Sequence, residues 1–451
     1  MDIDKILKPK IITSPPGPKA RQFIQHDRKL LSPSLSRTAP LVGVETQGVW
    51  VKDIDDNVFL DFGSGIAVAN IGHRHPEVVD AIIRQAQICD HVNSCDYFTV
   101  PQVQLAEALC ETIPGPFHKR IFFGNSGTEA VECAIKVARW HSRRHHFLGY
   151  IQSFHGRTMG ALQFTTTSAV ARRFYAPMMP GVIHVPYPYC YRCLFKQRYP
   201  ECGLYCLEYI RETVFKRIVC PDEVAGVLLE PILGAGGYVV PPDEYWPKLK
   251  GICEEHDILF IDDEVQTGFG RTGKMWACEH WGIEPDIMCI SKAMAGGLPI
   301  GACITRADVM DWVEGAHENT LGGNPIIVAA ALAVLGVIRR ERLADRAAEM
   351  GLYLVRRLRQ TAETHESMGD VRGKGLMIGI EFVKDGQTKA PATEERNTII
   401  REAFKKGLLI LAAGPSSLRL APPLIVTRDQ ADVGLQIIEE VIDNAEKEMT
   451  R

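Results

Sequence analysis

The sequence lacks the features that would place the protein in a membrane or on nucleic acid. No apolar run among its 451 residues is long enough to span a bilayer. The first residues, Met1–Lys5, include acids and no apolar core region follows them, so we expect no signal peptide. The net charge of -4 gives no basic surface for nucleic acid or an anionic membrane. These absences favour a cytoplasmic protein without nucleic-acid or membrane partners.

Internal repeats and low-complexity tracts are also lacking, whereas cysteine is plentiful. The thirteen cysteines are an odd number, scattered along the chain, and several lie inside apolar runs. This distribution is typical of buried, reduced thiols in a cytoplasmic protein rather than of a disulfide framework.

One group of cysteines is spaced like a metal site. Cys190, Cys193, Cys202 and Cys206 form the pattern C-x2-C, eight residues, C-x3-C. Four thiolates at such spacing can hold a structural zinc, but they can equally form disulfides or stay free. Because the second pair is not C-x2-C, we predict no metal here and keep zinc as the alternative.

A lysine follows a stretch that we expect to be a core strand. The apolar run Ile287–Ile290 predicts a buried strand, Ser291 and Lys292 come next, and the pair Gly296–Gly297 forms a turn. A lysine held between a core strand and a tight loop loses solvation, which favours the neutral, nucleophilic amine.

A second apolar run, Ile258–Ile261, ends in the acids Asp262, Asp263 and Glu264 and then in a glycine-rich loop. Pyridoxal phosphate chemistry needs a lysine that forms a Schiff base and an acid that keeps the pyridine nitrogen protonated, so that the ring accepts electrons. Two neighbouring strands that end in an acid and in Lys292 therefore predict a pyridoxal phosphate site.

The stretch Asp263–Gly273, Asp-Glu-Val-Gln-Thr-Gly-Phe-Gly-Arg-Thr-Gly, and the later Ser-Lys resemble the signature of class III aminotransferases. These are fold type I pyridoxal phosphate enzymes of the 4-aminobutyrate, ornithine and acetylornithine group. The resemblance runs from about Gly48 to the end of the chain. It implies that Lys292 and Asp263 are catalytic: Lys292 binds the cofactor and Asp263 pairs with its ring nitrogen.

Further cofactor contacts follow from the same resemblance. It implies that Val265 lies against the ring, that Gln266 bonds the ring hydroxyl and that Glu230 supports both Asp263 and Gln266. It places an aromatic at Phe154 on the ring, and we include the neighbouring His155 among the cofactor-binding residues. The alternatives are a core aromatic at Phe154 and a solvated loop from His155 onward.

A phosphate site is predicted where a short strand, Arg120–Phe123, gives way to a helix. Ser126, Gly127 and Thr128 lie in the turn between them, and apolar residues recur at helical spacing afterwards. Free backbone N–H groups, the positive end of the helix and the hydroxyls favour an anion. The alternative is a capped helix without a ligand, since Ser and Thr are good caps.

Substrate contacts and a partner subunit are also implied. Arg419 stands between apolar residues and resembles the arginine that binds the substrate carboxylate, with an interdomain ion pair as the alternative. Arg157 is a candidate for a distal carboxylate. By the resemblance, Thr320 reaches the phosphate of the partner subunit, which implies a homodimer.

Strands alternate with helical segments across residues 100–310, which indicates an α/β protein with a mostly parallel sheet covered on both faces. The resemblance implies a fold type I architecture: a large domain with a seven-stranded sheet, and a small α+β domain built from both termini. We predict an N-terminal arm and small-domain segment at 1–75, a large cofactor-binding domain at 76–335 and a small domain at 336–451. The first 40 residues, rich in Pro and Ser, are interpreted as an extended arm that wraps the body or a partner, with a loose tail as the alternative.

The activity predicted first is transamination of an amino acid, with an ω-amino acid such as 4-aminobutyrate as donor and 2-oxoglutarate or pyruvate as acceptor. Many family members have an acid at position 235 that covers the carboxylate-binding arginine when an ω-amino substrate enters; Ala235 stands here, which weakens that choice of donor. The alternatives are an amino-acid racemase or epimerase on the same fold and a non-enzymatic, zinc-held interaction protein.

Overall fold

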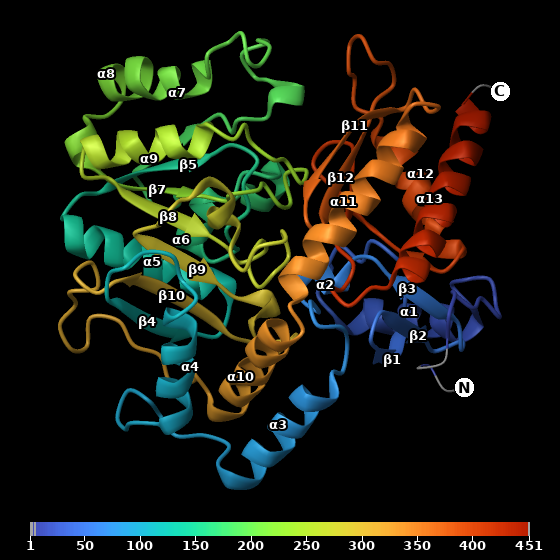
Figure 1. Cartoon of the computed structure of the whole chain (residues 1–451), viewed down its shortest axis with the longest axis horizontal. Coiled ribbons are helices and arrows are strands. Elements are labelled where there is room, and N and C mark those ends of the chain that lie inside the picture. Colours follow the sequence, from blue (N-terminus) through green and yellow to red (C-terminus); the bar gives the residue numbers. More distant parts are fainter. Residues whose placement is uncertain (1–2, 4–5, 450–451) are drawn as a thin grey trace.

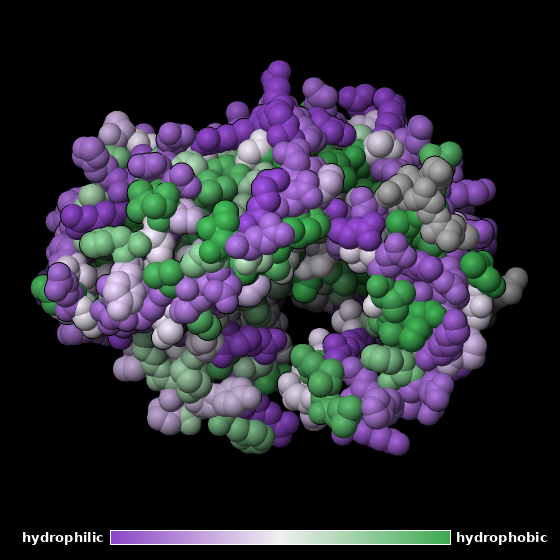
Figure 2. All heavy atoms as spheres, turned by 90° about the horizontal axis from the view of Figure 1, so that it is seen from below, coloured by the Kyte–Doolittle hydropathy of each residue, from purple (hydrophilic) through white to green (hydrophobic). Residues whose placement is uncertain are grey.

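The computed structural model describes residue 3 and residues 6–449 of the chain. A large part, built around one broad sheet, lies beside a smaller part that contains both ends of the chain (Figure 1). Seen from below, polar and apolar residues intermingle on the surface, and the molecule is hollowed between its parts (Figure 2). Within the described residues, no helix is both long and apolar enough to cross a bilayer.

The large sheet has seven strands in the order β4-β10-β9-β8-β7-β5-β6. Only β10 runs antiparallel to its neighbours, so the predicted mostly parallel sheet is confirmed. In order along the chain, the strands are β4 (Lys119–Gly124), β5 (His146–Tyr150), β6 (Val182–Val185), β7 (Val224–Leu229), β8 (Leu259–Asp263), β9 (Ile287–Ile290) and β10 (Gly301–Arg306).

Both faces of this sheet are covered, which explains why β7, β8 and β9 are buried along their whole length. Successive side chains of a strand point to opposite faces. Ile261 and Ile287 accordingly belong to the core beneath α5 (Gly127–Ser142), whereas Phe260 and Met288 belong to the core on the other face.

The helices are α1 (Pro18–Leu30), α2 (Ser64–Ala67), α3 (Pro76–Ile88), α4 (Val100–Cys110), α5 (Gly127–Ser142), α6 (Met159–Phe164), α7 (Tyr205–Tyr209), α8 (Phe215–Arg217), α9 (Tyr245–Glu255), α10 (Pro325–Arg340), α11 (Leu343–Ala362), α12 (Thr393–Lys405) and α13 (Arg428–Met449).

The smaller part has two four-stranded sheets, β1-β2-β3-β13 and β11-β12-β15-β14. Strand β13 joins the N-terminal sheet through a parallel pairing of Leu408 with Leu60, so residues from both termini share one sheet, which confirms the predicted small α+β part. The domain bounds 1–75, 76–335 and 336–451 stay a prediction. These strands are β1 (Gly43–Gln47), β2 (Trp50–Asp53), β3 (Val58–Asp61), β11 (Met368–Lys374), β12 (Met377–Phe382), β13 (Leu408–Leu409), β14 (Leu411–Ala413) and β15 (Ser417–Leu420).

The N-terminal segment is neither fully extended nor loose. Lys10 bridges to Val58 of β3, and α1 forms a regular helix that the sequence analysis did not expect. The carboxylate of Asp55 accepts hydrogen bonds from the backbone N–H groups of Lys19 and Ala20, at 2.9 and 2.8 Å. The cap of this helix therefore comes from a residue 35 positions away, which no local pattern reveals.

Candidate active site

Lys292 lies just beyond the carboxyl end of β9, where it begins a short 3₁₀ helix, Lys292–Ala295, with a left-handed φ of 45°. Ser291 fixes this bend, because its hydroxyl donates to the carbonyl of Ile300 at 2.5 Å. Lys292 is half-buried, and the protein around its amine desolvates it. This desolvation lowers the pKa of Lys292 to about 8 against the opposing pull of Asp263 and Glu230. The pKa therefore lies near physiological pH, where a neutral fraction of the amine is available for attack, as the sequence suggested.

Asp263 ends β8, the parallel neighbour of β9, and lies level with Cys289 in the register. Its Oδ2 atom is 2.6 Å from Nδ1 of the buried His155, and its Oδ1 atom accepts from the backbone N–H of Val265 at 3.1 Å. The backbone N–H of His155 is in turn held by Thr165 at 3.0 Å. His155 thus orients the acid, a role that the sequence did not reveal.

Glu230, just after β7, holds two loops of the site with one carboxylate. It accepts from the backbone N–H groups of Phe154 and Gly234, both at 2.9 Å. Burial and the nearby charge of Asp263 raise the pKa of Glu230 to about 7, while His155 acts in the opposite direction. A Cβ added at Gly234 would lie 2.1 Å from Nε2 of Gln266 and 2.8 Å from Oε2 of Glu230, so a larger residue would displace these two side chains.

Arg419 comes from β15 in the smaller part and reaches the same site. Its guanidinium lies 5.9 Å from the centre of the Tyr238 ring, and its charge acts on the Lys292 amine. The Tyr238 hydroxyl donates to Oε1 of Gln266 at 2.9 Å. Tyr238 therefore connects the predicted carboxylate-binding arginine with the predicted ring-hydroxyl partner, a role that no local sequence pattern indicates.

The predicted phosphate turn begins α5 as expected. Ser126 caps the helix through its hydroxyl, which accepts from the N–H of Glu129 at 3.3 Å, and its carbonyl accepts from Ala130. The N–H groups of Gly127 and Thr128 have no intrahelical partner, because they belong to the first turn. An added Cβ at Gly127 would lie 2.9 Å from Val265, so the turn and the predicted ring contact are adjacent.

The remaining predicted residues lie nearer the surface. Phe154 is half-buried, and Arg157 is exposed with its guanidinium 5.5 Å from the centre of the Phe154 ring. Thr320 is exposed on the loop between β10 and α10. The roles assigned to these three side chains stay predictions.

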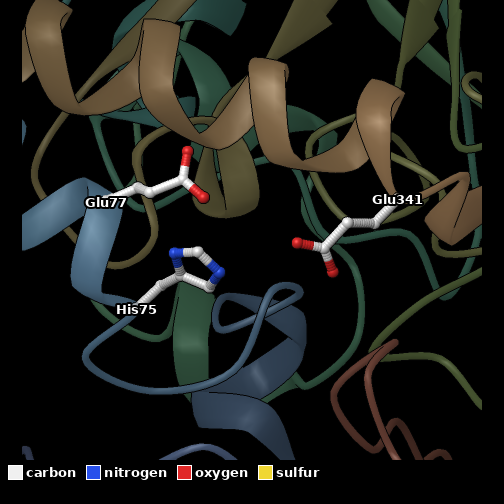
Figure 3. Close-up of side chains that lie close together, drawn as sticks. All are labelled: His75, Glu77 and Glu341. Carbon is white, nitrogen blue, oxygen red and sulfur yellow. The ribbon is translucent and has the colours of Figure 1, made fainter.

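Two other groups of ligand-type side chains lie outside this site. Figure 3 shows His75, Glu77 and Glu341 gathered where α3 begins and α10 ends. Arg340 already forms ion pairs with both carboxylates, at 2.5 Å to Glu77 and 3.3 Å to Glu341. These ion pairs account for the cluster without a metal.

The second group is buried behind Asp263, where Asp262, Glu264 and Cys278 share the opposite face of the sheet. Glu264 accepts from the backbone N–H of Cys278 at 2.8 Å. Burial and the neighbouring charges of Glu264 and Asp263 raise the pKa of Asp262 well above its usual range. Burial thus favours the neutral form of Asp262, and of this acidic run only Asp263 faces the site.

The four cysteines of the 190–206 segment are free thiols that influence one another. Burial, with Cys202 and Cys193 nearby, raises the pKa of Cys190 to about 11. Burial, with Cys190 and Cys202 nearby, raises the pKa of Cys206 to about 12. The disulfide alternative is not seen in the structure, and the four side chains lie in one neighbourhood.

Comparison with known proteins identifies the family. The model of the class-III aminotransferases matches residues 32–442, and the chain belongs to this family. It is 41% identical over 418 residues to a leucine/methionine racemase of Thermococcus litoralis, covering 92% of this chain and 94% of that protein. It is 38% identical over 441 residues to an alanine/serine racemase of Pyrococcus horikoshii, covering 96% and 92%.

Aminotransferases are similar as well. Curated aminotransferases match at 34% to 39% identity. The crystal structure of a Bacillus anthracis aminotransferase superimposes with a TM-score of 0.87 at 30% identity, covering 94% of this chain and 99% of that one. The fold type I architecture is thereby confirmed, and the chain is a pyridoxal phosphate-dependent enzyme of the class III family.

The residues present fit this cofactor. A desolvated amine, Lys292, stands beside an ionisable acid, Asp263, that a histidine orients. Two N–H groups without intrahelical partners, on Gly127 and Thr128, point from the start of α5 as an anion site requires. The amine of Lys292 is thus suited to the aldehyde of the cofactor, and the carboxylate of Asp263 to its ring nitrogen. The start of α5 is suited to the phosphate.

Proposed function

We propose that the protein racemises or epimerises a neutral α-amino acid. The bound pyridoxal phosphate supplies an electron sink that makes the α-proton of the substrate acidic. The observation that carries the proposal is similarity to two amino-acid racemases over more than nine-tenths of the chain, at up to 41% identity. Their substrates, as named, have small or apolar neutral side chains.

The carboxylate end of the substrate is assigned to Arg419. A guanidinium presents two parallel donors to a carboxylate, and Arg419 is the arginine whose charge acts on the Lys292 amine. Position 235 is an alanine and offers no carboxylate that could pair with Arg419. The arginine therefore remains free to bind the carboxylate of any substrate. This favours an α-amino acid as the substrate over 4-aminobutyrate, the donor that the family resemblance first suggested.

Lys292 is assigned the proton transfer. Its Nζ atom takes the proton from the α-carbon, because an amine with a pKa of about 8 works as base and, once protonated, as acid near physiological pH. Inversion then requires that a proton return to the opposite face of that carbon. Asp263, oriented by His155, keeps the ring nitrogen protonated. Glu230 and Gly234 hold the surrounding loops in place.

Transamination is the second candidate. Residues 233–237, Leu-Gly-Ala-Gly-Gly, carry no acid–base side chain. A racemase that uses two bases needs such a group opposite Lys292, whereas a transaminase needs only the lysine. The aminotransferases at up to 39% identity support this candidate too. A non-enzymatic role loses its support, because the chain belongs to an enzyme family and keeps the lysine and acid of its signature.

A single assay separates the two candidates. The holoenzyme is incubated with L-leucine, L-methionine, L-alanine or L-serine, with and without 2-oxoglutarate or pyruvate, and the products are resolved on a chiral column. We expect the D-enantiomer to form without any 2-oxo acid. Conversion that requires the acceptor and yields a new 2-oxo acid, with no D-amino acid, would establish transamination instead.

We also propose that the active protein is a homodimer in which Thr320 of each chain binds the cofactor phosphate of the other. Thr320 is exposed, as this role requires. Large apolar side chains are exposed on the neighbouring surface, among them Ile88, Phe98, Val100 and Val103 of α3, α4 and the loop between them. Light scattering should give about twice the chain mass of 50.1 kDa, and a monomer mass at full activity would refute the shared site.

A further inference from the structure

The four cysteines at positions 190, 193, 202 and 206 converge on a loop that the proposed reaction does not use. Cys190 begins a 3₁₀ turn, Cys193 follows it, Cys202 precedes α7 and Cys206 lies within α7. All four line one cavity of about 20 Å³, together with aromatic side chains such as Phe195. A cavity of that size has room for one ligand about as large as a water molecule.

The arrangement fits a metal better than it fits packing. Five cysteines elsewhere are buried and fill the hydrophobic cores, whereas Cys190 is exposed and the other three of this group are half-buried. The pairs at C-x2-C and C-x3-C each present two thiols from one short turn, and four thiolates complete a tetrahedral zinc site. No three of the four sulfurs lie within 4.8 Å of one another among the described residues, so the side chains must turn inward. Zn–S bonds of about 2.3 Å would bring the sulfurs to about 3.8 Å.

We propose that Cys190, Cys193, Cys202 and Cys206 bind one Zn²⁺ ion. Each thiol releases its proton to water as its sulfur bonds to the metal, and no electron is transferred. The ion crosslinks the first turn of the loop to α7. Zinc is favoured over harder cations because all four ligands are thiolates.

This zinc site would hold two side chains that fasten the large part to the small one. The hydroxyl of Tyr189 donates to the buried carboxylate of Glu381 in β12, and Nε of Arg192 donates to the same carboxylate at 2.6 Å. Glu381 pairs in register with Ser417 of β15, the strand that carries Arg419. The metal therefore acts at a distance from Lys292, by fixing the loop that anchors the strand of the carboxylate-binding arginine.

Metal analysis of the untagged holoenzyme tests the proposal independently of catalysis. We expect one zinc ion per chain after expression with added zinc. Cys202→Ser and Cys206→Ser should each lower this to less than a fifth, whereas Cys220→Ser, at an exposed cysteine outside the cluster, should leave it unchanged. Cobalt exchanged for zinc should give the visible bands of a tetrahedral thiolate site, at longer wavelengths than the cofactor absorbs.

Three results would overturn the proposal, and two of them use only the wild-type chain. The first is less than a tenth of a zinc ion per chain after zinc is supplied. The second is recovery of the four cysteines as disulfides in peptide mapping without reduction. The third is a zinc content that Cys202→Ser and Cys206→Ser leave as high as Cys220→Ser does, which would place the metal elsewhere. A misfolded variant does not affect the first two readouts.

Discussion

At the scale of single residues, the desolvated amine of Lys292 should make the rate of cofactor capture depend on pH. Only the neutral amine attacks the cofactor aldehyde, and its fraction rises with pH up to the pKa of about 8. We expect the rate at which the apoprotein captures pyridoxal phosphate to rise about tenfold per pH unit below that value and to level off above it. Stopped-flow absorbance between pH 6.5 and 10 measures this. A rate that still climbs at pH 10 would indicate an ordinary, solvated lysine.

His155 has a separate consequence, because it holds Asp263 through a charge-assisted hydrogen bond of 2.6 Å. Such bonds contribute roughly 1.5–3 kcal/mol, so His155→Ala should lower the turnover of the holoenzyme by about 10- to 100-fold. His155→Asn should recover part of the loss, since its amide N–H can take the place of Nδ1–H. Steady-state kinetics of both variants provide the check, and equal loss in the two would show that the imidazole acts in another way.

The residue roles divide clearly into those that local sequence reveals and those that it hides. Lys292 and Asp263 could be predicted because each follows an apolar strand within a long motif. The bond of His155 to Asp263 joins residues 108 positions apart, and that of Tyr238 to Gln266 joins residues 28 positions apart. Such pairings depend on how the strands are ordered in the sheet, which periodicity does not encode.

At the scale of elements, the start of α5 depends on the lack of a side chain at Gly127. A Cβ there would lie 2.9 and 3.1 Å from the two methyl groups of Val265, so Gly127→Ala must displace Val265 or the helix start. Overpacking of this kind costs about 1–3 kcal/mol, and we expect cofactor affinity to fall about tenfold or more. Equilibrium titration of the apoprotein measures it.

The matched control is Gly336→Ala in the middle of α10. Apart from its chain neighbours and the backbone of its own helix, nothing lies within 4 Å of a Cβ added at this exposed glycine, and its backbone is helical. The substitution should stabilise the fold by about 0.5–1 kcal/mol and leave cofactor affinity unchanged. Weakened cofactor binding in this variant would mean that the effect at Gly127 is not local.

Elements were predictable where the chain itself carries the signal. The strands β8 and β9 and the helix α5 follow from apolar runs and turn residues. The helix α1 was missed because Pro and Ser dominate its surroundings and its cap, Asp55, is distant in sequence. No local pattern predicts that β10 is antiparallel, because a buried strand has the same apolar pattern in either direction.

At the scale of the whole molecule, Glu381 joins the two parts. Its buried carboxylate accepts from Arg372 at 2.8 Å and from Arg192 at 2.6 Å, and Arg372 also donates to the carbonyl of Gly237 beside the site. Burial opposes ionisation, but the charge of Arg372 and several hydrogen bonds lower the pKa of Glu381 to about 2. The carboxylate is therefore ionised in the folded protein at all but strongly acidic pH.

Glu381→Gln should destabilise the protein by about 3 kcal/mol at pH 7, because the buried Arg372 and the half-buried Arg192 lose their counter-charge. A lowered pKa means that this contribution is complete above the unfolded value of 4.5 and is lost as pH falls toward 2. The difference between variant and wild type should therefore shrink in acid. Denaturant unfolding at pH 7 and pH 3.5 measures it, with the exposed Glu363→Gln as control; a difference that grows in acid would contradict this sign.

The most direct test of the account is exchange of the substrate α-proton in D₂O. The wild-type holoenzyme, incubated with L-leucine and no 2-oxo acid, should replace the α-proton by deuterium and accumulate D-leucine, as followed by ¹H NMR and chiral chromatography. Lys292→Ala should lose both signals by a factor of about a thousand or more. Undiminished exchange in Lys292→Ala would show that another group moves the proton, and the central role of this lysine would be wrong.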